Sequence, residues 1–454
     1  MSSLQSFLSA LSASERRLLL GAALLEAALM FVWSVTGTIA LRHGLLLLLI
    51  SMLPFIRLDL PALRREFGHG AILLLGMLTL WIVLHNLFFA WDAGRAWYES
   101  VQWFKAMLCL LLGLALVCAP RSARPAARWR FWLLGVAAAW ALHLILNVLL
   151  KDWSQPLVTV MQAATRVGSR DMVSYLGTGL LALLLADGVA RFAGGVRLLP
   201  LATRWLWVSV LACIALTVAT MTRNALPVMA VEVGLAIVAL IGASATRRQR
   251  LRRGALATLV LALVAGAMAA NLALDQRWTN FADSARIAWD TEHNTWWIDQ
   301  VKNPRPVNAQ GVPVDHSAYN RIAWIKGVCS MIAEYPLGTG YDRNAFRRAL
   351  MKHYGADNTA TGHAHAGLFD FTMATGIPGG VMFIGALLWL SLHGWRRWRA
   401  TRDPAGLALA IFTLSYLLRA AVDGIVRDHM LEQAMFVIGL LCAASMADHQ
   451  ESKA

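Results

Sequence analysis

Two histidines, His363 and His365, stand where the longest polar segment of the chain gives way to an apolar run. They belong to the sequence Thr-Gly-His-Ala-His-Ala-Gly over residues 361–367. A neutral imidazole can take a proton from a hydroxyl, and the positive end of a helix that follows it keeps the ring neutral. A positioned base of this kind contributes about 10²–10⁴ in rate. The pattern therefore predicts that His365 is a general base and that His363 supports it.

Two other interpretations of this histidine pair stay open. A metal site would need further ligands, and the nearby Asp357 and Asp370 do not stand at a spacing typical of zinc ligands. Residues two apart would also not share one face of a helix. The histidines could instead cap a helix or pack against it. Because a general base explains the pair without a third ligand, we expect neither a metal nor another cofactor.

Three arginines stand out: Arg170 and Arg223 because the connections that hold them contain few other Lys and Arg, and Arg321 because it begins a helix-like stretch with apolar or aromatic neighbours. Arg223 belongs to the turn Met-Thr-Arg-Asn between two apolar runs, and Arg170 directly precedes another run. Guanidinium groups bind phosphates through paired hydrogen bonds. The alternative for Arg223 is a side chain that extends to the membrane surface, and for Arg321 a solvated charge on a helix. We interpret the three arginines as ligands of a phosphate-bearing molecule.

The elements that must position these residues are apolar runs. The 454 residues are 58% hydrophobic and 15% charged, whereas a soluble domain has about a quarter charged residues. A helix needs about 20 apolar residues to cross a bilayer. The sequence predicts an all-α, polytopic membrane protein with about twelve spanning helices. The runs cover residues 18–39, 43–57, 70–91, 101–120, 131–150, 172–190, 199–221, 225–244, 254–274, 377–394, 404–422 and 429–447.

The formal net charge of +15 reflects Lys and Arg clusters in every second connection between the runs. This asymmetry is typical of the positive-inside rule. It is not the basic face of a soluble nucleic-acid-binding domain, so we expect no nucleic-acid partner. Both termini are predicted to be cytoplasmic, and the candidate site residues to lie outside. The chain divides into spans 1–9 (1–274), a large outer loop (275–376), and spans 10–12 with a cytoplasmic tail (377–454).

The outer loop between spans 9 and 10 is predicted to be a small ordered lid that carries the catalytic residues. Helices are expected around residues 319–333 and 343–354, with a Pro/Gly turn between them. Residues 365–375 read as a short helix along the membrane surface. Gly376 and Pro378 predict a break before the next span.

Short motifs in these segments resemble the superfamily of O-antigen ligases and O-antigen polymerases, bacterial inner-membrane glycosyltransferases. Thr222-Arg223 is similar to the Ser/Thr-Arg turn of that family. Asn320-Arg321-Ile322-Ala323-Trp324, followed by Glu334-Tyr335-Pro336-Leu337-Gly338-Thr339-Gly340, resembles its Arg-x-x-Trp…Pro-x-Gly-x-Gly loop. His363-Ala364-His365, leading to Thr375-Gly376-Ile377-Pro378-Gly379, resembles its His-x-His-Asn…Gly segment. The chain departs from the family pattern at Ala366, where an Asn is usual.

The resemblance implies a GT-C-like fold in the inner membrane with a site that faces the periplasm. It implies a polysaccharide donor on undecaprenyl pyrophosphate and, for a ligase, an acceptor hydroxyl on lipid A-core oligosaccharide. His365 would be the base, and Arg223, Arg321 and Arg170 would hold the pyrophosphate. The reaction of an O-antigen polymerase or of a protein O-oligosaccharyltransferase remains an alternative within the superfamily. A lipid or sugar transporter is the alternative outside it, because twelve spans are common among transporters.

Overall fold

The computed structural model describes residues 9, 11–56, 59, 61, 63–64, 70–118, 125–220, 222–244, 246–274, 280–355 and 361–451. Asp357, which the metal interpretation considered, lies outside these residues. Regular structure in the described part is helical, apart from an isolated bridge between Val307 and Pro313. The all-α prediction is therefore confirmed for this part of the chain.

The helices follow the predicted runs in order. The amino-terminal part contains α2 (Ala13–Val32), α3 (Ile39–Met52), the 3₁₀ turn η1 (Leu53–Phe55), α5 (Gly70–Phe88), α6 (Ala93–Val117), α7 (Pro125–Leu149), α8 (Leu157–Gln162) and α9 (Arg170–Phe192). It continues with α10 (Thr203–Ala219), α11 (Ala225–Gly242) and α12 (Arg247–Leu274). The outer loop forms α13 (Phe281–Trp289), α14 (His316–Glu334) and α15 (Ala345–Tyr354). The chain then forms α16 (Gly367–Thr401), α17 (Pro404–Val422) and α18 (Asp428–Glu451).

Eight of the described helices are long and apolar enough to cross a membrane: α5, α6, α7, α9, α11, α12, α16 and α17. Shorter apolar helices are formed by α3 with η1 and by α10. Helices α2 and α18 occupy the first and the last predicted runs. The chain is thus a polytopic, helical membrane protein, and the number twelve stays a prediction.

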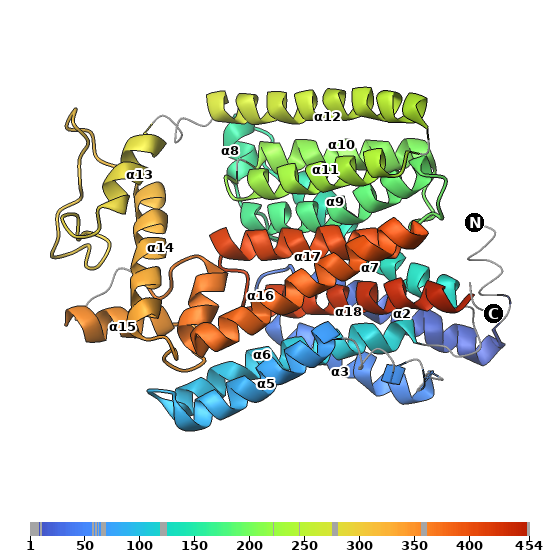
Figure 1. Ribbon diagram of the computed structural model, residues 1–454, viewed down its shortest axis with the longest axis horizontal. Helices are drawn as coiled ribbons and strands as arrows, with labels where there is room; N and C mark the ends of the chain where they lie inside the picture. Colours follow the sequence, from blue (N-terminus) through green and yellow to red (C-terminus); the bar gives the residue numbers. More distant parts are fainter. Residues whose placement is uncertain are drawn as a thin grey trace.

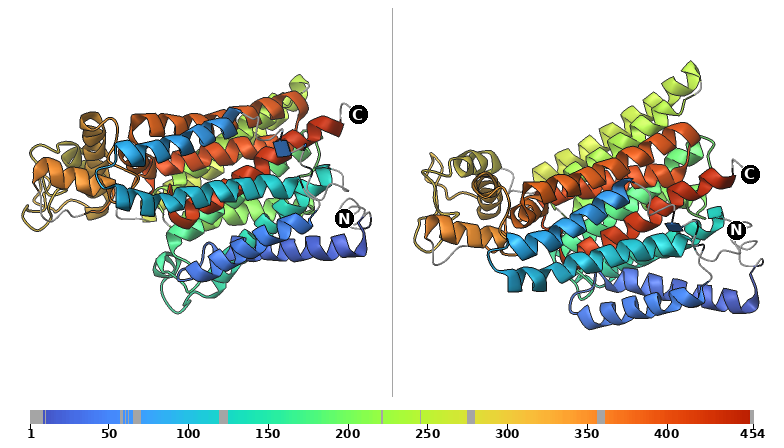
Figure 2. Two further views of the ribbon diagram at one scale, coloured as in Figure 1. Left: turned by 90° about the horizontal axis from the view of Figure 1, so that it is seen from below. Right: turned by 60° about the horizontal axis from the view of Figure 1, so that its bottom comes forward.

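The long helices lie side by side, and α13, α14 and α15 gather at one end of this bundle (Figure 1). The amino-terminal end of α2 and the carboxyl-terminal end of α18 lie toward the opposite end (Figures 1 and 2). This separation of the outer loop from the two described ends agrees with the predicted orientation. The side of the membrane that each end faces remains a prediction.

Helix α9 is the centre of the bundle. In the most apolar 18-residue stretch of α9, 94% of the residues are buried, whereas in that of α12 only 13% are buried. Helices α7, α10, α11 and α17 all pack against α9. The amino-terminal end of α9, where Arg170 lies, is therefore held by the core, while α12 presents most of its surface outward.

Helices α6 and α18 approach each other closely through glycines. A Cβ atom on Gly113 of α6 would lie 2.3 Å from the carbonyl oxygen of Phe436. A Cβ atom on Gly439 of α18 would lie 2.2 Å from the carbonyl oxygen of Leu110. Small residues permit this backbone contact, which dominates helix association where water does not drive it. The contact holds the middle of α18 against α6.

The outer helices have a hydrophobic core of their own, which includes Trp297, Tyr319 and Phe346. The predicted helices at 319–333 and 343–354 correspond to α14 and α15. Helix α14 begins three residues earlier than predicted, at His316, because the Asp315 side chain accepts a hydrogen bond from the backbone N–H of Ala318 at 2.7 Å. This cap makes the start of α14 a defined point beside the membrane helices.

The predicted break in α16 is present. Helix α16 begins at Gly367, two residues later than predicted, and departs from helical geometry at Gly376, where φ is 76°. A Cβ atom on Gly376 would lie 2.5 Å from the Leu337 carbonyl carbon, so only glycine fits there. The Ile377 N–H donates to the carbonyl oxygen of Pro336 at 2.8 Å. The Pro/Gly turn thus locks the first part of α16, which follows the histidines.

Candidate active site

Four arginines line one pocket of about 380 Å³, a volume that includes its open mouth. They are the three predicted arginines, Arg170, Arg223 and Arg321, and a fourth, Arg419. The other lining residues are Asp171, Thr222, Asn224, Ser317 and Asp423. We call this the arginine pocket. Since four arginines face two aspartates, it carries an excess of positive charge suited to an anionic ligand.

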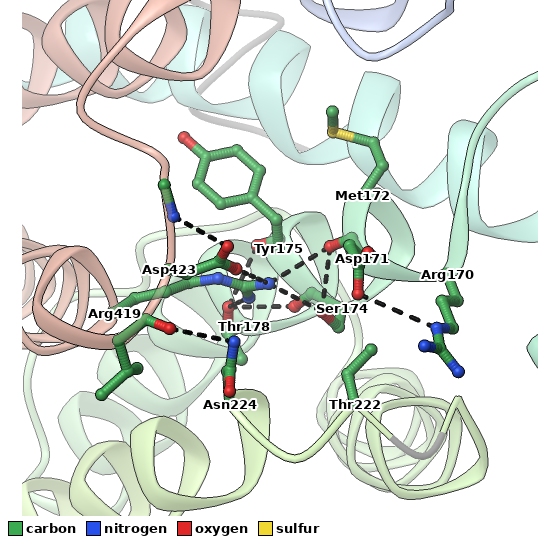
Figure 3. Close-up of polar contacts among 12 residues, drawn as sticks. Arg170, Asp171, Met172, Ser174, Tyr175, Thr178, Thr222, Asn224, Arg419 and Asp423 are labelled. Carbon is green, nitrogen blue, oxygen red and sulfur yellow. Dashed lines mark hydrogen bonds and ion pairs between the residues drawn. The ribbon is translucent and has the colours of Figure 1, made fainter. Parts of the chain in front are cut away.

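The four arginines come from four different elements. Arg170 is the first residue of α9, where the Ser169 hydroxyl caps the helix by accepting the Met172 N–H at 3.3 Å. Arg223 lies in the turn between α10 and α11, and Arg321 lies on α14. Arg419 lies in the last turn of α17. Figure 3 shows how α9, α11 and α17 bring their polar side chains together.

Arg419 is almost fully buried, with 2% of its surface exposed, and sequence analysis did not select it. Its guanidinium donates to the Ser174 hydroxyl at 2.8 Å and to the Asp171 carbonyl at 3.2 Å (Figure 3). It also pairs with the Asp423 carboxylate at 3.4 Å. An arginine inside a predicted span is costly unless it has such partners. That cost, together with an aspartate four residues later, was the signal in the sequence.

Asn224 joins the outer helices to the membrane helices. Its side-chain oxygen accepts a hydrogen bond from Arg321 Nη1 at 2.9 Å. Its Nδ2 donates to the carbonyl oxygen of Val422, at the end of α17, at 3.1 Å. One amide thus connects α14, the start of α11 and the end of α17. The sequence places Asn224 next to Arg223 but gives no sign of this bridge.

The Arg223 side chain faces the protein and not the surrounding medium, since 13% of it is exposed. Its Nη1 atom lies 3.7 Å from the Asp315 carboxylate, the residue that caps α14. Its guanidinium also lies over the Phe281 ring of α13, 5.8 Å from the ring centroid. These contacts argue against a side chain that merely extends to the membrane surface.

His365 lies beside the arginine pocket on the loop that precedes α16. Its φ of 55° is left-handed, a conformation that costs a non-glycine residue roughly 1–2 kcal/mol. Its ring stacks on Trp324 of α14, with centroids 5.3 Å apart and an interplanar angle of 19°. Trp324 follows Arg321 by one helical turn. The same helix therefore holds both the predicted base and a predicted phosphate ligand.

The pKa values of both histidines are lowered, so both rings are neutral near pH 7. Burial, followed by the charges of Arg321 and Arg427, lowers the pKa of His365 to about 4, against the opposing effect of Asp423. Burial, followed by the charges of Arg427, His365 and Arg343, lowers the pKa of His363 to about 3. A neutral ring at His365 can accept a proton.

His363 is held by a residue that sequence analysis left out. Arg427 Nη2 lies 2.8 Å from His363 Nε2, and because arginine can only donate, Nε2 is the acceptor. The rings of His363 and His365 are in edge contact, with centroids 4.1 Å apart. Arg427 therefore fixes the ring against which His365 rests.

Ala366, where the family pattern has Asn, is the N-cap residue of α16 and makes no side-chain cap. Asn is among the preferred residues at such a position. Asp370, one turn into the helix, instead accepts the Ala364 N–H at 2.7 Å. In this chain the segment 361–366, which we call the histidine loop, is thus held to α16 by a side chain of the helix itself. The described residues contain no group of three His, Cys, Asp or Glu side chains that could hold a metal ion.

The geometry combines a neutral imidazole with a positively charged pocket that can bind a phosphorylated leaving group. In comparisons with known proteins, residues 207–384 match the family model described as O-antigen ligase. No curated protein matches the chain. Arg223, Arg321, His363 and His365 lie within the matched range, while Arg170 and Arg419 lie outside it. Over residues 207–384 the chain is therefore similar to the domain of the O-antigen ligase family.

Proposed function

We propose that the protein transfers a polysaccharide from undecaprenyl pyrophosphate to a sugar hydroxyl of lipid A-core oligosaccharide. The family match implies lipid-linked polysaccharide substrates and an enzyme of the glycosyltransferase type. The convergence of four arginines beside a neutral histidine carries the proposal for the site. The site would face the periplasm of a bacterial inner membrane, with both termini in the cytoplasm and α13–α15 as a lid.

In the proposed reaction, His365 takes the proton of the acceptor hydroxyl. The hydroxyl oxygen forms a bond to the anomeric carbon of the donor sugar. The bond from that carbon to the pyrophosphate oxygen breaks, and its electron pair leaves with undecaprenyl pyrophosphate. The imidazolium then loses its proton to solvent or to the leaving group. The reaction needs no oxidant or reductant.

The arginine pocket would stabilise the leaving group. Charge develops on the pyrophosphate as the bond breaks, and hydrogen bonds to charged groups contribute roughly 1.5–3 kcal/mol each. Arg223, Arg321 and Arg170 are the proposed ligands, and Arg419 supplies a fixed positive charge at the wall. His363 would orient His365 through their ring contact. Arginines in these roles leave no step that requires a metal ion.

The test of the base is His365→Ala, with His353→Ala on α15 as the matched control. His353 pairs with Glu334 at 2.6 Å, away from the arginine pocket. Transfer by the purified, folded His365→Ala protein should fall by about 10²–10⁴, whereas the control should keep its activity. Transfer at the wild-type rate in His365→Ala would overturn the mechanism. The same assay with a chelator should leave the wild-type rate unchanged.

The choice of acceptor separates the related functions. Purified protein in detergent would receive the lipid-linked donor with lipid A-core, with a second lipid-linked chain, or with a protein. We expect extension of lipid A-core. Extension of the second lipid-linked chain would indicate a polymerase, and glycosylation of the protein a protein O-oligosaccharyltransferase. Transfer in detergent, where no second compartment exists, would also exclude transport as the sole function.

A further inference from the structure

A second pocket, of about 440 Å³ including its open mouth, is lined in part by two residues that contact the histidine loop. Its polar lining includes Glu99 and Gln102 of α6, Asp342 and Arg343 before α15, Asp370 of α16, and Arg427. We call it the mixed-charge pocket. Asp423 lines the arginine pocket, while Gly424, Val426 and Arg427 line this one. The connection between α17 and α18 is thus a wall that the two pockets share.

We propose that the mixed-charge pocket binds the sugar of the acceptor and presents its hydroxyl to His365. This proposal rests on the proposed transferase function. It gives the two substrates separate pockets, with the donor pyrophosphate among the arginines and the acceptor sugar on the α6 side of the wall.

The charges of this pocket suit a neutral polyhydroxyl ligand. Arg343 is neutralised by Glu99, at 3.2 Å, and by Asp428, at 2.9 Å. Asp342 is paired with Arg95 at 3.1 Å. Because Glu99, Asp342 and Asp370 face only two arginines in its lining, Arg343 and Arg427, the pocket lacks the positive excess that would select a phosphate. It still offers carboxylate and amide oxygens and N–H donors, the groups that hydrogen-bond to sugar hydroxyls.

Gln102 has hydrogen bonds that a ligand could replace. Its Nε2 donates to the Glu99 carboxylate at 3.3 Å, and its Oε1 accepts the Asp428 N–H at 3.3 Å. Both distances lie beyond the usual 2.9–3.0 Å for N–H···O contacts, so both bonds are weak. Its side chain is half-buried at the pocket wall. A sugar hydroxyl could take over either bond without leaving a buried group unpaired.

Two contacts connect this pocket to the proposed base. Asp370, in the pocket wall, accepts the Ala364 N–H at 2.7 Å, between the two histidines in sequence. Arg427, also in the wall, contacts His363 at 2.8 Å. The histidine loop is therefore fixed to the mixed-charge pocket on one side. On the other side, its His365 ring stacks on α14 of the arginine pocket. A sugar in the mixed-charge pocket would thus lie beside the loop that carries the base.

The test separates the two substrates kinetically in the full-length protein. Gln102→Ala should raise the KM for lipid A-core by roughly tenfold, the order expected for one or two lost hydrogen bonds, and leave the KM for the donor within about twofold. The matched variant on the other side, Arg170→Ala, should raise the KM for the donor instead. Equal changes of both KM values in Gln102→Ala would indicate a merely structural role and overturn the proposal.

A binding measurement keeps the proposal testable without turnover. Cys329 is exposed and the other four cysteines are buried, so Cys329→Ser gives a background for labelling. In that background, maleimide labelling of Gln102→Cys should be slowed at least about fivefold by lipid A-core and not by undecaprenyl pyrophosphate. Slowing by neither, or by the pyrophosphate alone, would overturn the assignment. Failure of His365 as the base would leave this result unchanged, so the two proposals can fail separately.

Discussion

The two pockets share the α17–α18 connection as a wall yet differ in how their charges are used. In the arginine pocket, four arginines outnumber the three aspartates that they contact, Asp171, Asp315 and Asp423. In the mixed-charge pocket, carboxylates pair with arginines in the wall, as Glu99 and Asp428 do with Arg343. A surplus of guanidinium groups selects an anion, whereas paired charges leave hydrogen bonding as the main attraction. On the proposed assignment, the difference teaches that one protein wall separates the site of the leaving group from the site of the nucleophile.

The largest expected effect comes from a change that would damage both pockets at once, Gly376→Ala. A Cβ there would meet the Leu337 backbone at 2.5 Å, at a φ of 76°. We expect strain and overpacking to lower the free energy of unfolding by about 2–5 kcal/mol, measured by thermal unfolding in detergent. The variant should also lose its transfer activity. The control is Gly234→Ala in α11, where a Cβ would meet open space and stability should hold. Equal stability of the two variants would contradict the role given to the break in α16.

Arg321→Ala should break the arginine pocket alone. It removes a ligand of the pyrophosphate and the hydrogen bond to Asn224 at 2.9 Å. We expect kcat/KM for the donor to fall roughly 10- to 100-fold, the cost of one charge-assisted hydrogen bond. The KM for lipid A-core should change little. Arg321→Lys should recover only part of the loss, because lysine cannot bind a phosphate through a planar pair of donors. Full recovery in that variant would indicate a simple charge effect.

The pH dependence tests how the wall between the pockets influences the base. Because the pKa of His365 is about 4, about nine in ten molecules should hold a neutral ring at pH 5, and kcat/KM should fall only below that pH. Arg427→Gln removes a charge that lowers this pKa, so the pKa should rise toward 6.5 and the acid limb should move to higher pH. Arg427→Lys keeps the positive charge, so the acid limb of its pH profile should stay at the wild-type pH. An unmoved limb in Arg427→Gln would contradict His365 as the titrating base.

The smallest effect is expected for Arg170→Ala. Arg170 is more exposed than Arg419, and its ion pair with Asp171 is long, at 4.0 Å. Exposed charges contribute roughly 0.2–1 kcal/mol, so donor affinity should fall by only about two- to fivefold. The loss should shrink at high salt, where the exposed charge is screened. A loss of donor affinity as large as that of Arg321→Ala would contradict this small effect and show that Arg170 is a main ligand of the donor.

Much of the site follows from local features of the sequence. The Lys and Arg asymmetry singled out Arg170 and Arg223, the apolar stretch that follows it singled out Arg321, and the structure brings all three to one pocket. The glycine and proline pattern placed the break at Gly376. The ends of the helices were predicted less accurately than the break. Helix α14 begins at His316, before the apolar pattern does, because the Asp315 cap and not hydrophobicity sets that end.

Arg419 and Arg427 escaped sequence analysis because their roles depend on distant partners. Arg419 contacts Ser174, 245 residues away, and Arg427 contacts His363, 64 residues away. The spacing of residues along the chain carries no information on such contacts. Only the packing of α17 against α9, and of the α17–α18 connection against the histidine loop, brings these groups together.

The sequence by itself determined that the chain is a helical membrane protein with two histidines before a break in a helix and with arginines suited to phosphate. These properties depend on composition and on neighbours within a few residues. Only the tertiary structure decided that four elements deliver their arginines to one pocket and that a shared wall creates a second pocket of paired charges. The physical reason is that the ligand a charged side chain can bind depends on the other charges near it, and the packing of the helices decides which charges are near.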